Sequence, residues 1–229
     1  MHYLSILANY KYPNAQFALG YIYENGKIVK RDLNKAIHYY SLAAGLNHLM
    51  AQFKLGVFYF EGEYIQRDVK KAIHYFALAA DQNCMEAQYN FGFINFDDLC
   101  KEKGIYKAIH YYSLSANQKN QHALFNLGSL YLEGKHVPRN INKTLQYYEL
   151  ASNLNHPVAQ YNLGIFYLRG EYVTKNIPKA IHYFSLSSEK NYDLSQLLLG
   201  FVYLERKNKQ DTKKAIHYFT LAANQNNTS

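Results

Sequence analysis

The chain has 229 residues, of which 48% are hydrophobic, and its formal net charge is +8. This length and hydrophobicity exclude a disordered protein, and no apolar run approaches the roughly 20 residues that a membrane-spanning helix needs. The positive charge allows an acidic partner, but the abundance of Lys, Asn, Ile and Tyr, which AT-rich codons encode, accounts for it equally well.

The first residues, MHYLSILANYKYP, lack the basic and apolar regions of a secretory signal. The two cysteines, Cys84 and Cys100, form no disulfide framework and are expected to be ordinary thiols. Both observations favour a cytoplasmic protein. Met1 aligns with Ile37 of the repeats described next, so residues 1–12 are predicted to form a partial helix. Its side chains Tyr3, Ile6 and Leu7 would be exposed and would allow end-to-end self-association.

One segment recurs along the whole chain with little change. KAIHYYSLAA begins at Lys35, and its copies begin at Lys71, Lys107, Lys143, Lys179 and Lys214, 36 residues apart except for a last spacing of 35. A second segment, AQFKLGVFYFEG from Ala51, recurs with the same period. Two apolar segments per period predict one supersecondary unit that is stacked several times. A single array is expected, with repeats at 13–48, 49–84, 85–120, 121–156, 157–192 and 193–229.

The first segment of each repeat, which we call helix A, has helical periodicity. Ala51, Leu55, Gly56 and Tyr59 fall on one face at 3.6 residues per turn. A glycine inside a helix costs about 0.5–1 kcal/mol relative to alanine, so the recurrence of Gly56 predicts a close approach of another helix. Helix A is predicted to end at a glycine in four repeats: Gly26, Gly62, Gly134 and Gly170.

The second segment, helix B, is preceded by residues that favour helix N-termini. These predicted N-caps are Asp32, Asp68, Gly104, Asn140, Asn176 and Asp211. Its predicted packing face is Ala36, Tyr39, Tyr40, Ala43 and Ala44. The asparagines that follow most copies, which tolerate the left-handed conformation of a helix end, are Asn47, Asn83, Asn155 and Asn191. The fold class is therefore all-α, built of helical hairpins.

The combined pattern, AxxxLGxxYxxG followed by KAxxYYxxAA, resembles the Sel1-like repeat family, which is related to the tetratricopeptide repeats. Tyrosine stands where that family commonly has a tryptophan in helix B, as at Tyr75. The resemblance implies a right-handed superhelical α-solenoid of about six helix-turn-helix repeats that acts as a non-catalytic protein–protein interaction scaffold or adaptor. A secreted branch of the family carries a cysteine pair in each repeat, and its ligands are disfavoured here because those cysteines are absent.

A histidine recurs in helix B, at His38, His74, His110, His182 and His217. Equivalent residues of stacked helices lie about 8–10 Å apart, whereas zinc ligands lie about 2 Å from the metal, so neighbouring copies cannot share one ion. On a helical wheel His38 lies opposite Ala36 and Ala44, which predicts a solvent-facing row. No nucleotide-binding, metalloprotease or nucleophile motif occurs, so neither an enzyme nor a cofactor is expected.

Partner binding is expected on the concave surface formed by helix A, where the residues vary between repeats while the packing positions repeat. Three asparagines in register would suit an extended peptide backbone. The predicted partner-binding residues are Lys54, Asn90, Asn126, Asn162, Tyr21, Phe93, Glu61, Glu133 and Arg169. Drift at unconstrained positions would produce the same variation, and Tyr21 and Phe93 would equally suit the core.

Basic residues gather at the loop edge of the repeats and provide an alternative, a polyanion or RNA site. They include Lys30, Arg31, Lys35, Arg67, Lys70, Lys71, Arg139 and Lys143. Helical repeats that recognise RNA bases need positively charged residues beside the variable positions. Here the basic residues lie in the loops instead, so nucleic acid is the less favoured partner.

Overall fold

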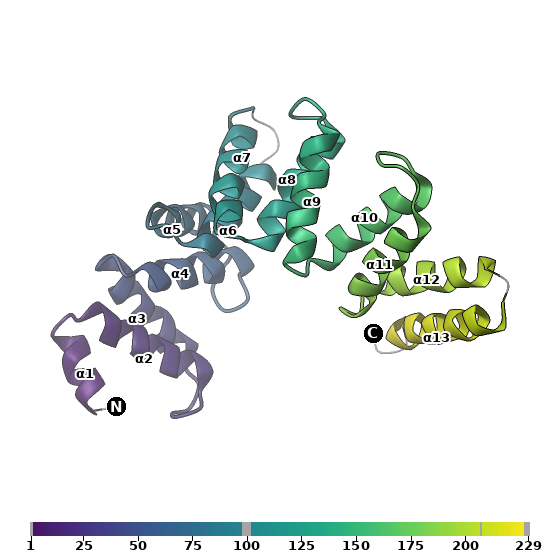
Figure 1. The fold of residues 1–229 in the computed structure, drawn as a ribbon. Helices are drawn as coiled ribbons and strands as arrows, with labels where there is room; N and C mark the ends of the chain where they lie inside the picture. The colour runs from purple at the N-terminus through teal and green to yellow at the C-terminus, as the bar shows by residue number, and fades with distance from the viewer. Residues whose placement is uncertain (1, 98–101, 207, 227–229) are drawn as a thin grey trace. The chain divides into compact units, whose positions relative to one another are not determined.

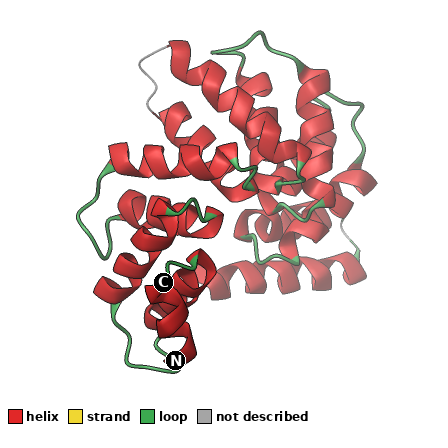
Figure 2. Ribbon diagram, turned by 90° about the vertical axis from the view of Figure 1, so that its left-hand side faces the viewer, coloured by secondary structure: helices red, strands yellow, loops and turns green. Residues whose placement is uncertain are grey.

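The computed structural model describes residues 2–97, 102–206 and 208–226, and over these residues the chain forms helices and no strand (Figures 1 and 2). The chain divides into two compact units, residues 1–118 and 119–229. Unit 1 contains α1 (His2–Asn9), α2 (Pro13–Asn25), α3 (Leu33–Gly45), α4 (Leu49–Glu61), α5 (Val69–Asp81), α6 (Met85–Asp97) and α7 (Glu102–Asn117). Unit 2 contains α8 (Gln121–Glu133), α9 (Ile141–Asn153), α10 (Pro157–Arg169), α11 (Ile177–Ser188), α12 (Asp193–Glu205) and α13 (Lys209–Asn226).

Within each unit the helices pack in chain order. The hairpin pairs are α2 with α3, α4 with α5 and α6 with α7 in unit 1, and α8 with α9, α10 with α11 and α12 with α13 in unit 2. Each helix B also contacts the next helix A of its unit, as α3 contacts α4 and α11 contacts α12. The predicted all-α solenoid of helical hairpins is confirmed.

The predicted N-caps are confirmed in four of the six repeats. The side chains of Asp32, Asp68, Asn140 and Asn176 each accept a hydrogen bond from the backbone N–H three residues later, at 2.9–3.0 Å. Gly104 and Asp211 were wrong predictions, because α7 begins earlier, at Glu102, and α13 begins at Lys209. Glycine has no side chain that could cap α7. In α13 the capping oxygen is Oδ1 of Asn208, which accepts from the Asp211 N–H at 2.9 Å.

Helix ends follow the predicted left-handed pattern. The glycines after helix A, such as Gly62, have φ of 67–72°, and the asparagines after helix B, such as Asn83, have φ of 58–66°. Lys11 and Lys119 adopt the same conformation at equivalent positions, with φ of 62° and 68°. The left-handed conformation therefore recurs at this position of the repeat, and lysine adopts it where the asparagine is missing.

The recurrent glycine of helix A packs directly against an aromatic ring of helix B. A methyl group at Gly56 would lie 2.6 Å from Cδ1 of Phe76, and one at Gly20 would lie 2.6 Å from Cδ1 of Tyr40. Both rings are fully buried. The predicted close approach is confirmed, and its partner is the second aromatic residue of the KAIHYY segment.

Candidate binding surface

We define the helix-A surface as the residues three, six and ten positions after the first alanine (or serine) of each helix A, described separately for the two units. Six positions after the first alanine or serine, this surface carries large aromatic side chains that are exposed to solvent. Tyr21 on α2 and Phe93 on α6 are 53% and 40% exposed in unit 1, and Phe201 on α12 is 54% exposed in unit 2. The Phe93 ring is held by Tyr89 on its own helix (6.4 Å between centroids) and Phe60 on α4 (6.3 Å). These aromatics lie at the surface.

The charged residues ten positions after the first alanine, at the end of helix A, are exposed. Glu61 lies on α4 of unit 1, and Glu133 and Arg169 lie on α8 and α10 of unit 2. Arg169 Nη1 lies 3.3 Å from Oε1 of Glu171, two residues later. Such an exposed pair contributes at most about 1 kcal/mol, so these charges are available to a partner.

Lys54 has a partner inside unit 1. Its Nζ lies 2.8 Å from Oε1 of Glu24 on α2, and the other carboxylate oxygen accepts a 2.5 Å hydrogen bond from the Tyr40 hydroxyl. Burial and the Glu24 carboxylate both raise the pKa of Tyr40. Lys54 thus joins two successive repeats. Sequence reasoning missed Glu24, because the repeat pattern does not relate residues that lie 30 positions apart.

The three predicted asparagines differ in their surroundings. In unit 2, the Asn162 side chain interacts with the buried Tyr148 hydroxyl, which also lies 3.0 Å from Ser129 Oγ. In unit 1 the residue equivalent to Tyr148 is Phe76, which has no hydroxyl, and Asn90 makes no side-chain hydrogen bond to any residue that the structure describes. Asn126, in unit 2, likewise makes none there. Among the residues that the structure describes, Asn162 therefore has an internal partner for its side chain, whereas Asn90 and Asn126 have none.

The recurrent lysine of the loop edge covers a tyrosine ring in five repeats. Lys71 Nζ lies 4.9 Å from the centroid of Tyr59, and that ring stacks on Tyr75 of helix B with 5° between the planes. The same Lys–Tyr–Tyr stack occurs at Lys35, Lys143, Lys179 and Lys214, with lysine-to-ring distances of 4.5–5.2 Å. This contact explains why a lysine recurs at the start of helix B, where the helix dipole disfavours it.

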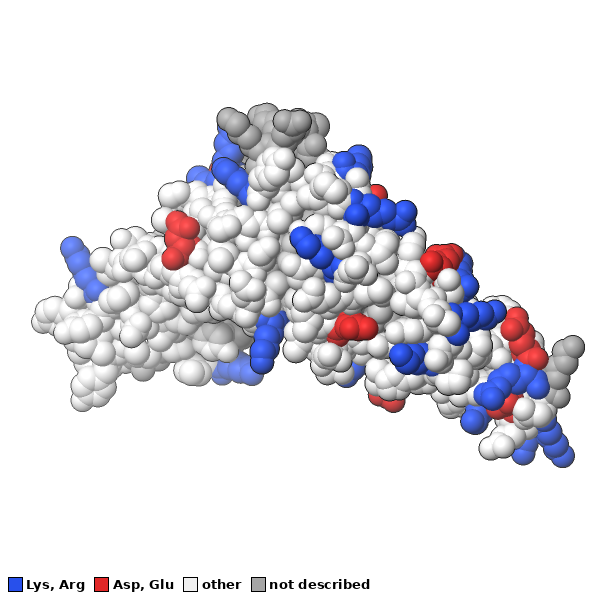
Figure 3. All heavy atoms as spheres, turned by 45° about the horizontal axis from the view of Figure 1, so that its top comes forward, with Lys and Arg blue, Asp and Glu red and all other residues white. Residues whose placement is uncertain are grey.

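The loop arginines also have partners within the fold. The guanidinium carbons of Arg31 and Arg139 lie 5.2 Å from the ring centroids of Tyr64 and Tyr172, each in the loop of the next repeat. Arg67 donates from Nε to the Phe60 carbonyl at 3.0 Å. Figure 3 shows basic side chains spread among acidic and uncharged ones on this face. Much of the predicted basic edge therefore stabilises the repeats.

The recurrent histidines of helix B are exposed, as predicted. Each packs edge-on against the tyrosine that follows it, as His74 does against Tyr75 at 5.3 Å between centroids. Within the described ranges, no group of three His, Cys, Asp or Glu side chains is placed to hold a metal ion. Cys84 is buried, and burial raises the pKa of its thiol, which disfavours the reactive thiolate. Cys100 lies outside the described residues.

Comparison with known proteins identifies the family. A family model described as the Sel1 repeat matches residues 13–48, 49–84, 86–120, 121–156, 157–192 and 194–227. The chain belongs to the Sel1 repeat family. Sel1 repeat proteins are generally scaffolds for protein–protein interaction and generally non-catalytic. Among curated protein sequences, none matches this chain.

Solved structures share the fold of this Sel1 repeat chain. A protective antigen present in uropathogenic Escherichia coli strains is 28% identical with a TM-score of 0.88, over 98% of this chain and 48% of the antigen. This chain thus spans about half the length of that protein. A Sel1 repeat protein from Oxalobacter formigenes is 27% identical with a TM-score of 0.83, over 93% of this chain and 88% of its own. None of the described helices is long and apolar enough to cross a membrane.

Proposed function

We propose that this Sel1 repeat chain is a non-catalytic scaffold that binds a peptide or protein partner on the helix-A surface. The observation that carries the proposal is the exposure of Phe93, a large aromatic side chain on a helix whose neighbouring positions are packed. Aromatic anchors of this kind supply most of the binding energy at protein interfaces. The unit-1 surface is therefore the first place to look for a partner.

The surroundings of Phe93 suit a peptide or protein ligand. Asn90 lies one helical turn before Phe93, and its amide can both donate to and accept from a peptide backbone. Tyr21 presents a second exposed aromatic ring on α2. Glu61, at the end of α4, adds an exposed charge of the sort found at the rim of an interface.

The loop edge is the weaker candidate for the binding surface. A polyanion site needs cations that can reach phosphate or carboxylate groups. The recurrent lysines and the loop arginines of this chain, such as Lys71 and Arg31, instead contact aromatic rings of the repeats. These contacts within the repeats account for the positions of the basic residues without a ligand. The helix-A surface is therefore favoured as the binding surface.

Site-specific photo-crosslinking tests the proposal. A benzophenone amino acid would replace Phe93, and in control chains it would replace Tyr106 on α7 or Ile28 in a loop, both 70% exposed. We expect a crosslinked partner from lysate at position 93 that the Phe93→Ser and Asn90→Glu chains no longer retain in affinity capture. Nuclease treatment and raised salt should leave that partner bound.

Two outcomes would contradict the proposal. Crosslinking at position 28 but not at position 93 would place the contact on the loop edge. Recovery of nucleic acid that is lost at moderate salt would identify a polyanion ligand, because such binding weakens steeply with ionic strength.

A further inference from the structure

The last repeat has a shorter loop between its two helices than the repeat before it. Residues 170–176 separate α10 from α11, whereas residues 206–208 separate α12 from α13. Helix α13 begins at Lys209, one turn earlier than the repeat pattern predicts, and this extra turn takes up part of the missing loop. The last repeat therefore lacks the side chains that the longer loop carries.

The longer loop has a packing function elsewhere in the chain. In unit 1, Tyr64 and Ile65 of the second repeat pack against a cluster of buried side chains from α3 and α4, and Ile37 of α3 packs against the same cluster. The Tyr64 ring meets Phe58 edge-on at 6.0 Å between centroids, and the Arg31 guanidinium lies 5.2 Å from the ring. An aromatic residue followed by a β-branched residue thus covers the preceding helix B.

Unit 2 repeats this arrangement once. Tyr172 and Val173 take the positions of Tyr64 and Ile65. The Tyr172 ring lies edge-on to Phe166 at 4.8 Å between centroids, and the Arg139 guanidinium lies 5.2 Å from it. In both units the loop tyrosine therefore packs between a phenylalanine of its own helix A and an arginine of the preceding repeat.

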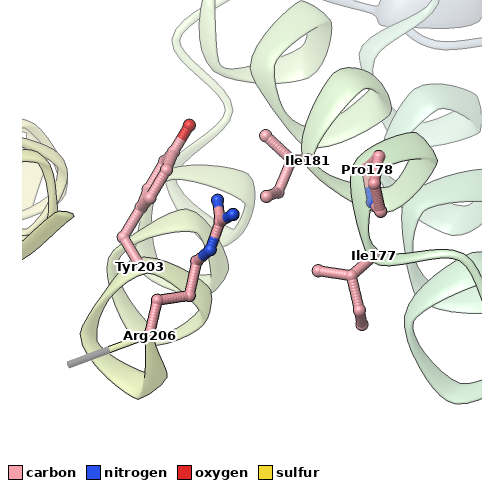
Figure 4. Close-up of a pocket in the computed structure, with 5 residues that line it drawn as sticks. All are labelled: Ile177, Pro178, Ile181, Tyr203 and Arg206. Atoms are coloured by element: carbon pink, nitrogen blue, oxygen red, sulfur yellow. The ribbon is translucent and has the colours of Figure 1, made fainter. Parts of the chain in front are cut away.

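In the last repeat the equivalent site is an open cleft of about 590 Å³. Its floor is formed by Ile177, Pro178 and Ile181 of α11. Tyr203 of α12 and Arg206, which directly follows α12, face them (Figure 4). Ile181 takes the position that Ile37 has in the first repeat.

Two further substitutions in the last repeats suit an added ligand. Val202 stands where the second and fifth repeats, the two that carry the loop tyrosine, have the larger Phe58 and Phe166, and this leaves more room beside the cleft. Lys175, which is exposed, takes the position of Arg31 and Arg139, the cations that lie against the loop tyrosine. A cation is therefore available beside any aromatic ring that enters.

We propose that this cleft binds an extended segment of a partner protein in which an aromatic residue precedes a β-branched one. The segment would reproduce the packing of Tyr64 and Ile65, with its ring beside Lys175 and its aliphatic side chain on Ile181. The cleft lies on the hairpin loop side of α11 and α12, separate from the helix-A surface, so this site does not depend on the function proposed above.

A labelled peptide provides the direct test. The probe is the heptapeptide GEYVTKN, residues 170–176 of this chain, titrated with the full chain and followed by fluorescence polarisation. We expect saturable binding with a dissociation constant on the order of 0.1–1 mM, which is typical of a few buried side chains. A peptide with alanine in place of the tyrosine and valine should bind at least about tenfold more weakly.

Chain variants then locate the site. Ile181→Glu should weaken binding of the heptapeptide at least about tenfold. The matched control is Ile216→Glu, at the equivalent position of α13, which is 62% exposed and outside the cleft. Replacing residues 206–208 with GEYVTKN should fill the cleft and abolish binding while circular dichroism shows the helices intact.

The loop graft keeps the test decisive if Ile181→Glu unfolds the chain. Equal binding of the tyrosine–valine and alanine peptides, or undiminished binding to the loop-graft chain, would overturn the proposal. Phe93→Ser should leave binding of the heptapeptide unchanged, which separates this site from the helix-A surface. Binding that is lost with Phe93→Ser and retained by the graft would assign the peptide to the helix-A surface instead.

Discussion

The side-chain amide of Gln82, at the end of α5, donates a hydrogen bond to Oε1 of Gln52, at the start of α4, at 2.6 Å. Gln52 in turn donates to the carbonyl of Ala44, at the end of α3, at 3.4 Å. Gln88 and Gln118 form the same contact one repeat later, at 2.9 Å. The buried glutamine of helix A therefore links the ends of successive B helices through satisfied polar groups.

This relationship predicts a stabilising substitution in the first repeat. Gln16 donates to the Ala8 carbonyl at 3.1 Å, but its Oε1 is buried and has no hydrogen-bond partner among the described residues. Leu46 stands at the position of Gln82. Leu46→Gln should supply the missing donor and raise the free energy of unfolding by about 1 kcal/mol, measured by urea denaturation.

The reverse change is the matched test. Gln82→Leu should lower the free energy of unfolding by about 1–3 kcal/mol, because it leaves Oε1 of Gln52 buried and without its donor. Leu46→Ala controls for loss of the leucine, which is 42% exposed. A Leu46→Gln chain no more stable than the Leu46→Ala chain would contradict the assignment.

A second prediction concerns the glycine of helix A. Gly56→Ala places a methyl group 2.6 Å from Cδ1 of the buried Phe76 ring, so the two helices must separate. Overpacking of this kind costs about 1–3 kcal/mol and outweighs the gain of up to about 1 kcal/mol in helix propensity. We expect a net loss of stability in thermal and urea denaturation.

Gly45, the last residue of α3, is the control for this substitution. A methyl group there meets no atom within 4 Å. Gly45→Ala should therefore be neutral or stabilising by up to about 0.5 kcal/mol. Equal effects at Gly45 and Gly56 would show that helix propensity, and not the contact with Phe76, decides the outcome.

The sequence predicted the features that repeat and missed those that do not. Gly62, Asp68 and Asn83 occupy local positions whose backbone requirements depend on neighbours within a few residues, so their roles could be read from spacing. Asp211 was assigned wrongly because the short loop of the last repeat places Asn208 in the capping position.

The candidate site was less predictable for a physical reason. The availability of Lys54 and Asn162 depends on Glu24 and Tyr148, which lie in the preceding repeat, 30 and 14 residues away. A pattern within one repeat carries no information about such pairs. The exposure of Phe93, which sequence alone left open between surface and core, likewise required the arrangement of α4 and α6.

A third prediction concerns the recurrent lysine. Lys71→Met removes the ammonium from the Tyr59 ring and should lower the free energy of unfolding by about 0.5–1 kcal/mol. Lys70→Met changes an exposed lysine one position earlier in α5 and should have little effect. Destabilisation by Lys70→Met equal to that by Lys71→Met would mean that net charge, and not the ring contact, is responsible.

The last prediction concerns pH. His156 caps α10 in unit 2: its Nδ1 accepts from the Ala159 N–H at 3.2 Å, and its buried ring stacks on Phe125 at 4.6 Å. Burial, with a smaller contribution from the charge of the neighbouring His122, lowers the pKa of His156 from 6.5 to about 4. A protonated Nδ1 cannot accept the hydrogen bond, so the folded state requires the neutral ring.

The sign of the effect follows from this pKa. Between pH 6.5 and about 4 the unfolded chain binds the proton more readily than the folded chain, so the contribution of His156 is complete above pH 6.5 and is lost as the pH falls. The contribution of His156 to the free energy of unfolding falls by about 2–3 kcal/mol between pH 7 and pH 4.

The equivalent cap of α8 is Asn120, whose Oδ1 accepts from the Ala123 N–H at 3.0 Å and which does not titrate. The His156→Asn chain should therefore lose about 2–3 kcal/mol less stability than the parent between pH 7 and pH 4. His182→Asn, at an exposed position of α11, should keep the parent profile. Identical pH profiles for His156→Asn and the parent, measured by urea denaturation at each pH, would rule out His156 as the titrating cap.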